Sequence, residues 1–270
     1  MDPKFRRGHL ERLIAHDQKN PRPHATRSQQ EPLRVDRAAG TRNANHQVAM
    51  SHGSILVQNR DVELFGRTNI PVPPVWLSLS EPENPEPGWA QTLCDSAVAA
   101  KTVIDISQRP GLFGGLIAGR GSLVMAVGGG DCSRAPDAHW AKNFIEAKLV
   151  SVLSCIRQDH LDFFFLDYAG PWEEAQINGA LEAMESARTE GLIRFAGLNA
   201  SGNDLATLAM WQFHDAFDAI LMSPNSFPTL GPLAHDRRVG TLIRELEIEG
   251  NPVLRRTSTP VPTMTIGGHR

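Results

Sequence analysis

The most regular hydrophobic pattern in the chain starts with a nearly continuous apolar run at Leu161–Leu166. A stretch with apolar residues at helical spacing follows, from Ala175 to Glu190, and a second apolar run, Ile193–Leu198, comes after Gly191. Continuous rather than alternating apolar runs are typical of strands in a parallel sheet whose two faces are both covered. We therefore predict a strand–helix–strand unit over this part of the chain.

The same alternation of short apolar runs and helical stretches extends in both directions from this unit. Further strands are predicted at Val75–Leu79, Thr102–Asp105, Ser122–Val127, Phe217–Met222 and Pro252–Leu254. Further helices are predicted at Trp89–Ala100, Ala138–Gln158, Asp204–Phe213 and Val239–Ile248, and a hairpin at Val62–Val72. The succession predicts an α/β fold of the TIM-type (β/α) barrel class. Its seven strands are one fewer than the usual eight, so the prediction is a barrel that lacks strand eight at its C-terminal end.

The first 50 residues differ from the rest in both pattern and charge. They carry ten Lys or Arg against five Asp or Glu, a net charge of +5, which leaves −8 for the remainder. Their apolar residues show almost no periodicity, so we expect a disordered basic leader over 1–50 and a barrel domain over 51–270. The acidic balance of the barrel disfavours nucleic acid as a partner of the whole chain.

Cysteine usage and hydropathy bear on the compartment. Cys94, Cys132 and Cys155 are scattered and form no CxxC pair, so the sequence predicts neither a disulfide framework nor a zinc site. No apolar run reaches the length of a membrane span, so we expect no membrane association and a cytoplasmic location.

Polar residues at the ends of the predicted strands are the candidates for chemistry: Asp105, Asp167, Tyr168, Asn199 and Asn225. Barrels of this class place their sites at the carboxyl ends of the strands. Asp105 and Asp167 could act as an acid–base pair or offer oxygen ligands to a divalent cation, or they could be solvated loop carboxylates without catalysis. Tyr168 is the sole tyrosine; a substitute proton donor and a structural residue are both open readings. No metal site is assigned.

Several motifs resemble, in the same order, those of the aldo-keto reductase superfamily over about residues 62–254. They are the hairpin Leu64–Thr68, the strand Leu161–Leu166, the helix and strand Ala180–Gly197, and Phe217–Asn225 with its following turn. The resemblance implies a barrel that binds NADP and reduces carbonyls with an Asp–Tyr–Lys–His tetrad. In that tetrad the Tyr is the general acid, the Lys–Asp pair lowers its pKa, and the His orients the carbonyl.

Carried over by position, three of the four tetrad residues depart from the family. Asp105 matches the family Asp, whereas the Tyr position holds Pro110. The Lys position falls at Gly128 or its neighbour Val127, and the His position holds Asp167. Since proline has no proton to donate, the resemblance implies an unsuitable tetrad and argues against the family's carbonyl reduction.

The cofactor platform departs as well. Where the family has a Ser-Asn pair for the nicotinamide amide, this chain has Asn199-Ala200, and the family Gln appears as Leu221. A counterpart of the phosphate-binding segment around strand eight is absent from the sequence. Asn199 and Asn225 are the candidate cofactor-binding residues, and NADP is expected from the resemblance alone.

Three functions stay open. The first is a binding or regulatory protein, a pseudoenzyme on this fold that takes a small-molecule ligand or joins a homo-oligomer or partner subunit. The second is an NAD(P)H-dependent oxidoreductase with altered residues, and the third is a non-redox lyase or isomerase using Asp105 and Asp167. The sequence favours the first.

Overall fold

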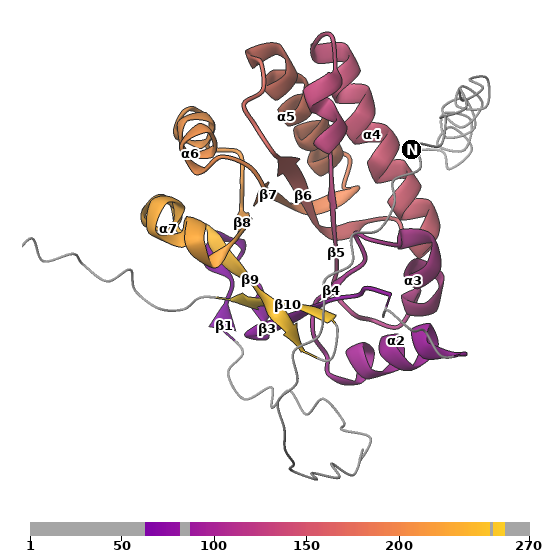
Figure 1. The fold of residues 1–270 in the computed structure, drawn as a ribbon. Coiled ribbons are helices and arrows are strands. Elements are labelled where there is room, and N and C mark those ends of the chain that lie inside the picture. The colour runs from indigo at the N-terminus through magenta and orange to yellow at the C-terminus, as the bar shows by residue number, and fades with distance from the viewer. Residues whose placement is uncertain (1–62, 82–86, 249–250, 257–270) are drawn as a thin grey trace, which may run out of the picture. The chain divides into compact units, whose positions relative to one another are not determined.

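The computed structural model describes residues 63–81, 87–248 and 251–256, which belong to one compact unit (Figure 1). The leader expected over 1–50 lies outside these residues. Within them, eight strands form a closed barrel in the order β10-β3-β4-β5-β6-β7-β8-β9. Their bounds are β3 Val75–Ser78, β4 Ile104–Asp105, β5 Val124–Gly128, β6 Leu161–Tyr168, β7 Ile193–Ala200, β8 Ala219–Met222, β9 Gly240–Ile248 and β10 Asn251–Arg256.

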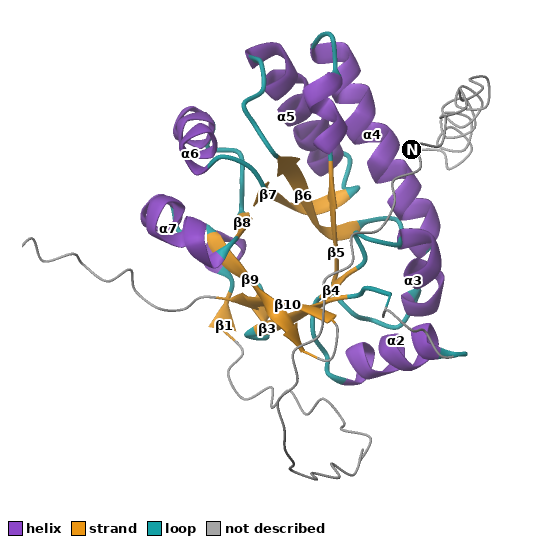
Figure 2. Ribbon diagram, in the orientation of Figure 1, coloured by secondary structure: helices purple, strands orange, loops and turns teal. Residues whose placement is uncertain are grey.

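Helices lie outside the ring of strands, and a hairpin precedes it (Figure 2). The helices are α2 Trp89–Ala99, α3 Pro110–Ile117, α4 Ala138–Ile156, α5 Glu174–Thr189, α6 Asp204–Phe213 and α7 Phe227–Asp236. In the hairpin, β1 (Glu63–Leu64) pairs antiparallel with β2 (Pro71–Val72). The predicted TIM-type barrel and the predicted hairpin are therefore confirmed. No helix in the described ranges is both long and apolar enough to cross a membrane.

The barrel closes in an unusual way. Strands β3 to β9 run parallel to one another, seven in all. The eighth place is filled by β10, which returns antiparallel to β9 and also pairs antiparallel with β3. The sequence predicts seven strands without an eighth; among the described residues seven strands are parallel, and an eighth, antiparallel strand completes the ring. The strand predicted at 252–254 is β10, which closes the ring as one arm of a hairpin.

The helix predicted at Val239–Ile248 is wrong, because Gly240–Ile248 forms strand β9. Leu, Glu and Arg favour helix, but tertiary packing decides here. The Gly240 backbone lies against the hairpin, and a Cβ added there would meet the Phe65 ring at 2.6 Å. The helix before β9 is α7, which the sequence reading missed because it contains Pro228 and Pro232.

Helix α3 was also missed, in the glycine-rich stretch before β5. Pro110 occupies its first turn, where a missing N–H costs nothing. Gly114 lies against the backbone of α4, since an added Cβ would come within 2.8 Å of the Cys155 carbonyl carbon. A glycine that disfavours helix in isolation therefore permits the close contact between α3 and α4.

The central strand–helix–strand unit forms as predicted. Helix α5 begins with a capping box, in which Glu173 and Gln176 satisfy each other's backbone N–H groups. After its end the chain turns at Gly191, whose φ of 73° suits glycine. Strand β7 then pairs with β6 along its length, from Leu161 opposite Ile193 to Tyr168 opposite Ala200.

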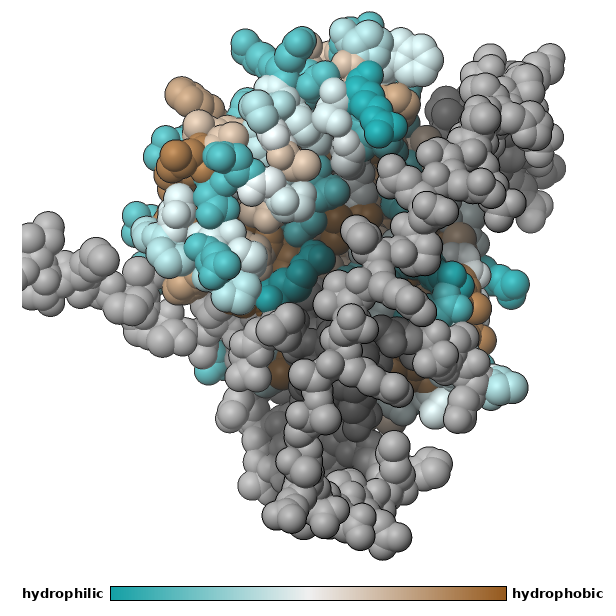
Figure 3. Space-filling view, viewed as in Figure 1, coloured by the Kyte–Doolittle hydropathy of each residue, from teal (hydrophilic) through white to brown (hydrophobic). Residues whose placement is uncertain are grey.

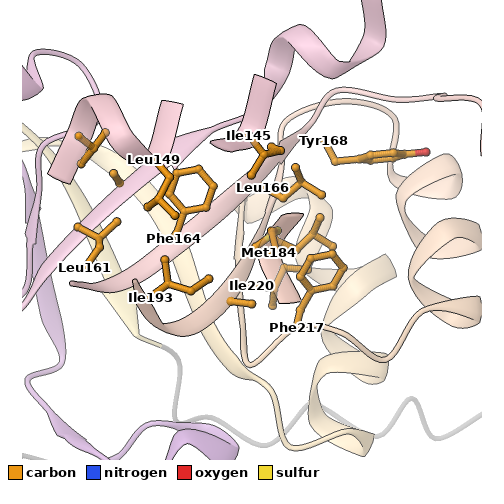
Figure 4. Packing of buried hydrophobic residues seen from close by; sticks show 14 of the residues in the cluster. Ile145, Leu149, Leu161, Phe164, Leu166, Tyr168, Met184, Ile193, Phe217 and Ile220 are labelled. Atoms are coloured by element: carbon orange, nitrogen blue, oxygen red, sulfur yellow. The ribbon is translucent and has the colours of Figure 1, made fainter. Parts of the chain in front are cut away.

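Alternate residues of each strand divide the apolar side chains between two cores. The interior core lies within the barrel and includes Phe65, Trp76, Phe163 and Phe165. The Trp76 ring centroid is 5.0 Å from those of both Phe65 and Phe163, so the hairpin residue Phe65 closes the end of the barrel where the strands begin. The outer core lies between strands and helices and includes Phe164 from β6 (Figure 4).

Candidate functional site

The strand register places polar side chains inside the barrel at the carboxyl ends of the strands. Inward positions alternate along a strand, so Asp167 follows Phe163 and Phe165 on the interior side of β6. Asp167 pairs with Asn199, and Asn199 pairs with Leu221. We define the mouth cluster as the polar residues of two hydrogen-bonded networks at this end of the barrel. One network holds Ser78, Asp105 and Ser107, and the other holds Asp167, Asn199, Ser201 and Arg244.

In the Asp105 half of the mouth cluster, the carboxylate is buried and accepts hydrogen bonds from neighbouring residues. Asp105 is 4% exposed, and its Oδ2 accepts a hydrogen bond from Ser78 Oγ at 2.7 Å. Its Oδ1 accepts from the Ser107 N–H at 2.9 Å and also from the Ser107 hydroxyl. Ser107 Oγ in turn accepts from the Val127 N–H at 2.8 Å. Both carboxylate oxygens are therefore occupied by donors from the protein, as a buried charge requires.

The Asp167 half is more open. Oδ1 of Asp167 accepts from Asn199 Nδ2 at 2.8 Å and from Ser201 Oγ at 2.6 Å. The side-chain Oδ1 of Asn199 accepts a hydrogen bond from Arg244 Nη2 at 3.4 Å. Gly130 leaves room for the carboxylate, since a Cβ there would lie 2.9 Å from Asp167 Oδ2. Asn199 is buried, whereas Ser201 and Arg244 are exposed, so this half faces solvent.

The structure does not bring Tyr168 or Asn225 into this network. Tyr168 faces the helices and is 2% exposed, with its ring centroid 5.1 Å from that of Trp172. Figure 4 shows Tyr168 beyond Leu166 and Ile145 among the outer-core residues. Asn225 is exposed in the short 3-10 helix Pro224–Ser226 that follows β8. Tyr168 is thus placed as a packing residue, and the predicted grouping with Asp105 and Asp167 is not what the geometry gives.

The resemblance assigns the family's Tyr to the start of α3 and its Lys to the end of β5. Pro110 is the first residue of α3. Val127 packs against the interior core, whereas Gly128 faces α4, where an added Cβ would meet Lys148 Cγ at 2.5 Å. The interior position at the end of β5 therefore belongs to valine, which brings no charge toward Asp105.

Sequence reasoning missed Arg244 and the three serines of the mouth cluster. Arg244 was hidden by the wrong helix prediction, although the alternation of Leu242 and Arg244 is that of a strand with one inward face. Ser78 lies in the predicted strand 75–79 and pairs with Asp105, and Ser107 follows Asp105 by two residues, so their closeness to Asp105 was the available signal.

Nucleophilic thiols and metal ligands are the remaining candidates for chemistry. Burial raises the pKa of Cys132, which lies just after β5, to about 12, and that of Cys94 to about 11. Both thiols are therefore protonated at neutral pH and are poor nucleophiles. In the part of the chain that the structure describes, no three or more His, Cys, Asp or Glu residues are grouped as a metal site requires.

Comparison with solved structures bears on the fold. The barrel superposes on an aldo-keto reductase from Bacillus halodurans in its holo form with a TM-score of 0.53 and 16% identity, over 67% of this chain and 63% of that one. An aldo-keto reductase from Brucella melitensis gives a TM-score of 0.53 and 12% identity, over 67% of this chain and 72% of that one. The chain has the aldo-keto reductase fold.

The likeness is structural and partial. The chain covers less than two thirds of the Bacillus reductase, 63% of its length. No protein-family model matches the sequence, and no curated protein matches it. At such identities the superposition establishes the fold, and function has to be argued from the site.

The aldo-keto reductase fold implies a nicotinamide cofactor, whose carboxamide would lie beside the positions of Asn199 and Leu221. A carboxamide needs donors and acceptors, yet the position of the family Gln holds Leu221, which is fully buried among apolar interior residues. Both ends of the Asn199 amide already bond within the mouth cluster, to Asp167 and Arg244. The described residues therefore do not fit a nicotinamide amide as the family holds it.

Proposed function

We propose that this chain is a small-molecule-binding protein on an aldo-keto reductase barrel, without the family's carbonyl reduction. The observation that carries the proposal is the interior position at the end of β5. It holds Val127, packed against apolar residues, while serines rather than a lysine surround Asp105. Without a Lys–Asp pair, the site lacks the arrangement by which the family lowers the pKa of its tyrosine general acid.

The mouth cluster supports binding in place of reduction. Its Asp167 half offers a guanidinium, a hydroxyl and a carboxylate at the exposed end of the barrel. A few convergent polar groups above an apolar interior are typical of small-molecule sites. A regulatory role would follow if ligand occupancy altered the protein's interactions. Assembly into a homo-oligomer or with a partner subunit remains a prediction, which the molar mass from light scattering would test.

The two enzymatic alternatives gain less support. An NADP-dependent reaction would need a cofactor platform that Leu221 and Asn199 do not supply. A lyase or isomerase would need both carboxylates free to meet a substrate, whereas both oxygens of Asp105 accept hydrogen bonds from Ser78 and Ser107. The cytoplasm is retained as the expected compartment, in keeping with the free cysteines Cys94, Cys132 and Cys155.

The test is titration of the full chain with NADPH and NADH, followed by quenching of tryptophan fluorescence, together with turnover assays on a panel of aldehydes. We expect no saturable quenching below about 1 mM cofactor, a free energy of binding weaker than about 4 kcal/mol, and no NADPH oxidation above the rate without protein. Aldehyde-dependent NADPH oxidation that Asp105→Asn abolishes would overturn the proposal.

A further inference from the structure

We infer that the Asp167 half of the mouth cluster binds the carboxylate of a small organic acid, with Arg244 recognising the charge. This inference rests on the proposed function, because it names the ligand class for the same site. It starts from the one cation that the described residues place in the mouth cluster.

Arg244 is directed into the mouth by the register of β9. It follows Leu242 by two residues, and Leu242 is buried in the interior core, so both side chains lie on the inward face of the strand. Arg244 itself is exposed, and its Nη2 reaches Asn199 Oδ1 on β7 across the intervening strand β8. The guanidinium thus lies at the barrel opening, where a ligand from solvent can meet it.

The partner of this guanidinium is a neutral amide. Within the described residues Arg244 makes one hydrogen bond, at 3.4 Å to Asn199, and forms no ion pair within 4 Å. A guanidinium carries five N–H donors in a planar fork, so one long bond leaves a full edge for a ligand. A carboxylate matches that edge with two parallel hydrogen bonds, the strongest geometry available to arginine.

Neither Asp105 nor Asp167 forms a hydrogen bond or an ion pair with Arg244. Both oxygens of Asp105 accept hydrogen bonds from protein donors. Oδ1 of Asp167 accepts from Asn199 and Ser201, and the bond from Asn199 Nδ2 fixes the amide so that its oxygen points to Arg244. Asp167 therefore orients Arg244 through Asn199, which makes Asp167 and Asn199 positioning residues for the cation.

The experiment compares benzoate with benzamide, its neutral counterpart of the same shape, by ligand-detected NMR on the full chain. We expect benzoate to bind at least about tenfold more tightly than benzamide, the scale of one charge-assisted bidentate pair. Arg244→Gln should weaken benzoate binding about tenfold and leave benzamide unchanged. Arg244→Lys should fall between, because it keeps the charge and loses the fork.

The control variant is Arg134→Gln, which removes the same charge from an exposed arginine in the 3-10 helix Gly130–Arg134 that follows β5. It should leave benzoate affinity within about twofold of the parent. Circular dichroism and thermal midpoints establish that each variant is folded before its affinity is compared.

The outcomes separate this inference from the proposed function. Equal binding of benzoate and benzamide, unaffected by Arg244→Gln, would overturn charge recognition by Arg244 and leave a small-molecule site without it. Absence of benzoate binding, or an equal loss in Arg134→Gln, would also overturn it. NADPH-dependent reduction is measured separately and bears on the proposed function alone.

Discussion

The two halves of the mouth cluster show how differently a barrel can treat two carboxylates at equivalent strand ends. Asp105 is 4% exposed and bonded through both oxygens to Ser78 and Ser107. Asp167 is half-buried and bonded through one oxygen to residues that lead outward to Arg244. A strand-end position alone therefore does not make a functional residue. What decides is whether hydrogen bonds close the carboxylate off, as at Asp105, or link it to a group that solvent can reach, as Asn199 links Asp167 to Arg244.

The largest effect is expected on the free energy of unfolding when the buried carboxylate of Asp105 is removed. Asp105→Leu removes the acceptor for two hydroxyls and one backbone N–H in a buried site. We expect it to lower the free energy of unfolding by about 3 kcal/mol, the cost of leaving buried donors unsatisfied. Urea denaturation measures this value, and a loss below about 1 kcal/mol would show that the Asp105 half is not closed as described.

A smaller effect is expected for Asn199→Leu, which removes the link between the carboxylate and the guanidinium. Asn199 is buried and bonds to both Asp167 and Arg244, so the variant should cost about 2 kcal/mol. It should also make benzoate binding less dependent on Arg244, since the cation loses its orienting partner. A double-mutant cycle with Arg244→Gln measures that coupling, and strictly additive effects would mean that the two residues act separately.

Asp167→Leu should change stability by less than about 1 kcal/mol, because the half-buried site lets water replace the acceptor that Asn199 and Ser201 lose. Its cost relative to Asp105→Leu is the sharpest measure of the difference between the halves. Chemical denaturation of the two variants in parallel measures this difference. Equal losses of unfolding free energy would show that the two carboxylates are held equally tightly.

The smallest effect belongs to Ser201→Ala. Ser201 is exposed and donates to the oxygen of Asp167 that Asn199 also bonds. We expect a change in unfolding free energy within about 0.5 kcal/mol, typical of surface substitutions. Thermal denaturation is sufficient to detect a larger shift, which would show that the hydroxyl holds the carboxylate in place.

The sequence was informative where local pattern and packing agree. The runs at Leu161–Leu166 and Ile193–Leu198 are apolar because both faces of these strands are covered, by the interior core on one side and by helices on the other. Asp105, Asp167 and Asn199 were found because strand-end polar residues are visible in the sequence. Of the two roles left open for Tyr168, the packing favours the structural one, because strand alternation turns the side chain away from Asp167, toward Trp172.

The rest could not be read because tertiary contact overrides local preference. Pro228, Pro232 and Gly114 argue against helix in the sequence, yet α7 and α3 form around them. Residues 240–248 favour helix by composition, yet they complete the sheet beside β8. Because this strand was not predicted, Arg244 was not recognised as a site residue. Its position in the mouth cluster follows from a strand that tertiary packing determines.

Packing around the ring also leaves apolar groups outside. Leu205 and Phe213, both on α6, are 70% and 85% exposed, and Figure 3 shows hydrophobic atoms at the surface over this helix. Isolated exposed apolar residues are normal on protein surfaces. They mark α6 as a lightly packed part of the outer layer, in contrast to α4 and α5, each of which contributes more buried residues to the outer core than α6 does.

The antiparallel strand β10 affects how the chain folds, because it protects the edges of the sheet. Until β10 is in place, the curved sheet from β3 to β9 has two open edges, at its first and last strands. Open edges are templates for pairing with other chains. Strand β10 covers both edges at once, since Leu254 pairs with Trp76 of β3 on one side and with Arg244 of β9 on the other. Closing the ring therefore covers both edges in a single step, and that step requires contact between strands that lie far apart in the sequence.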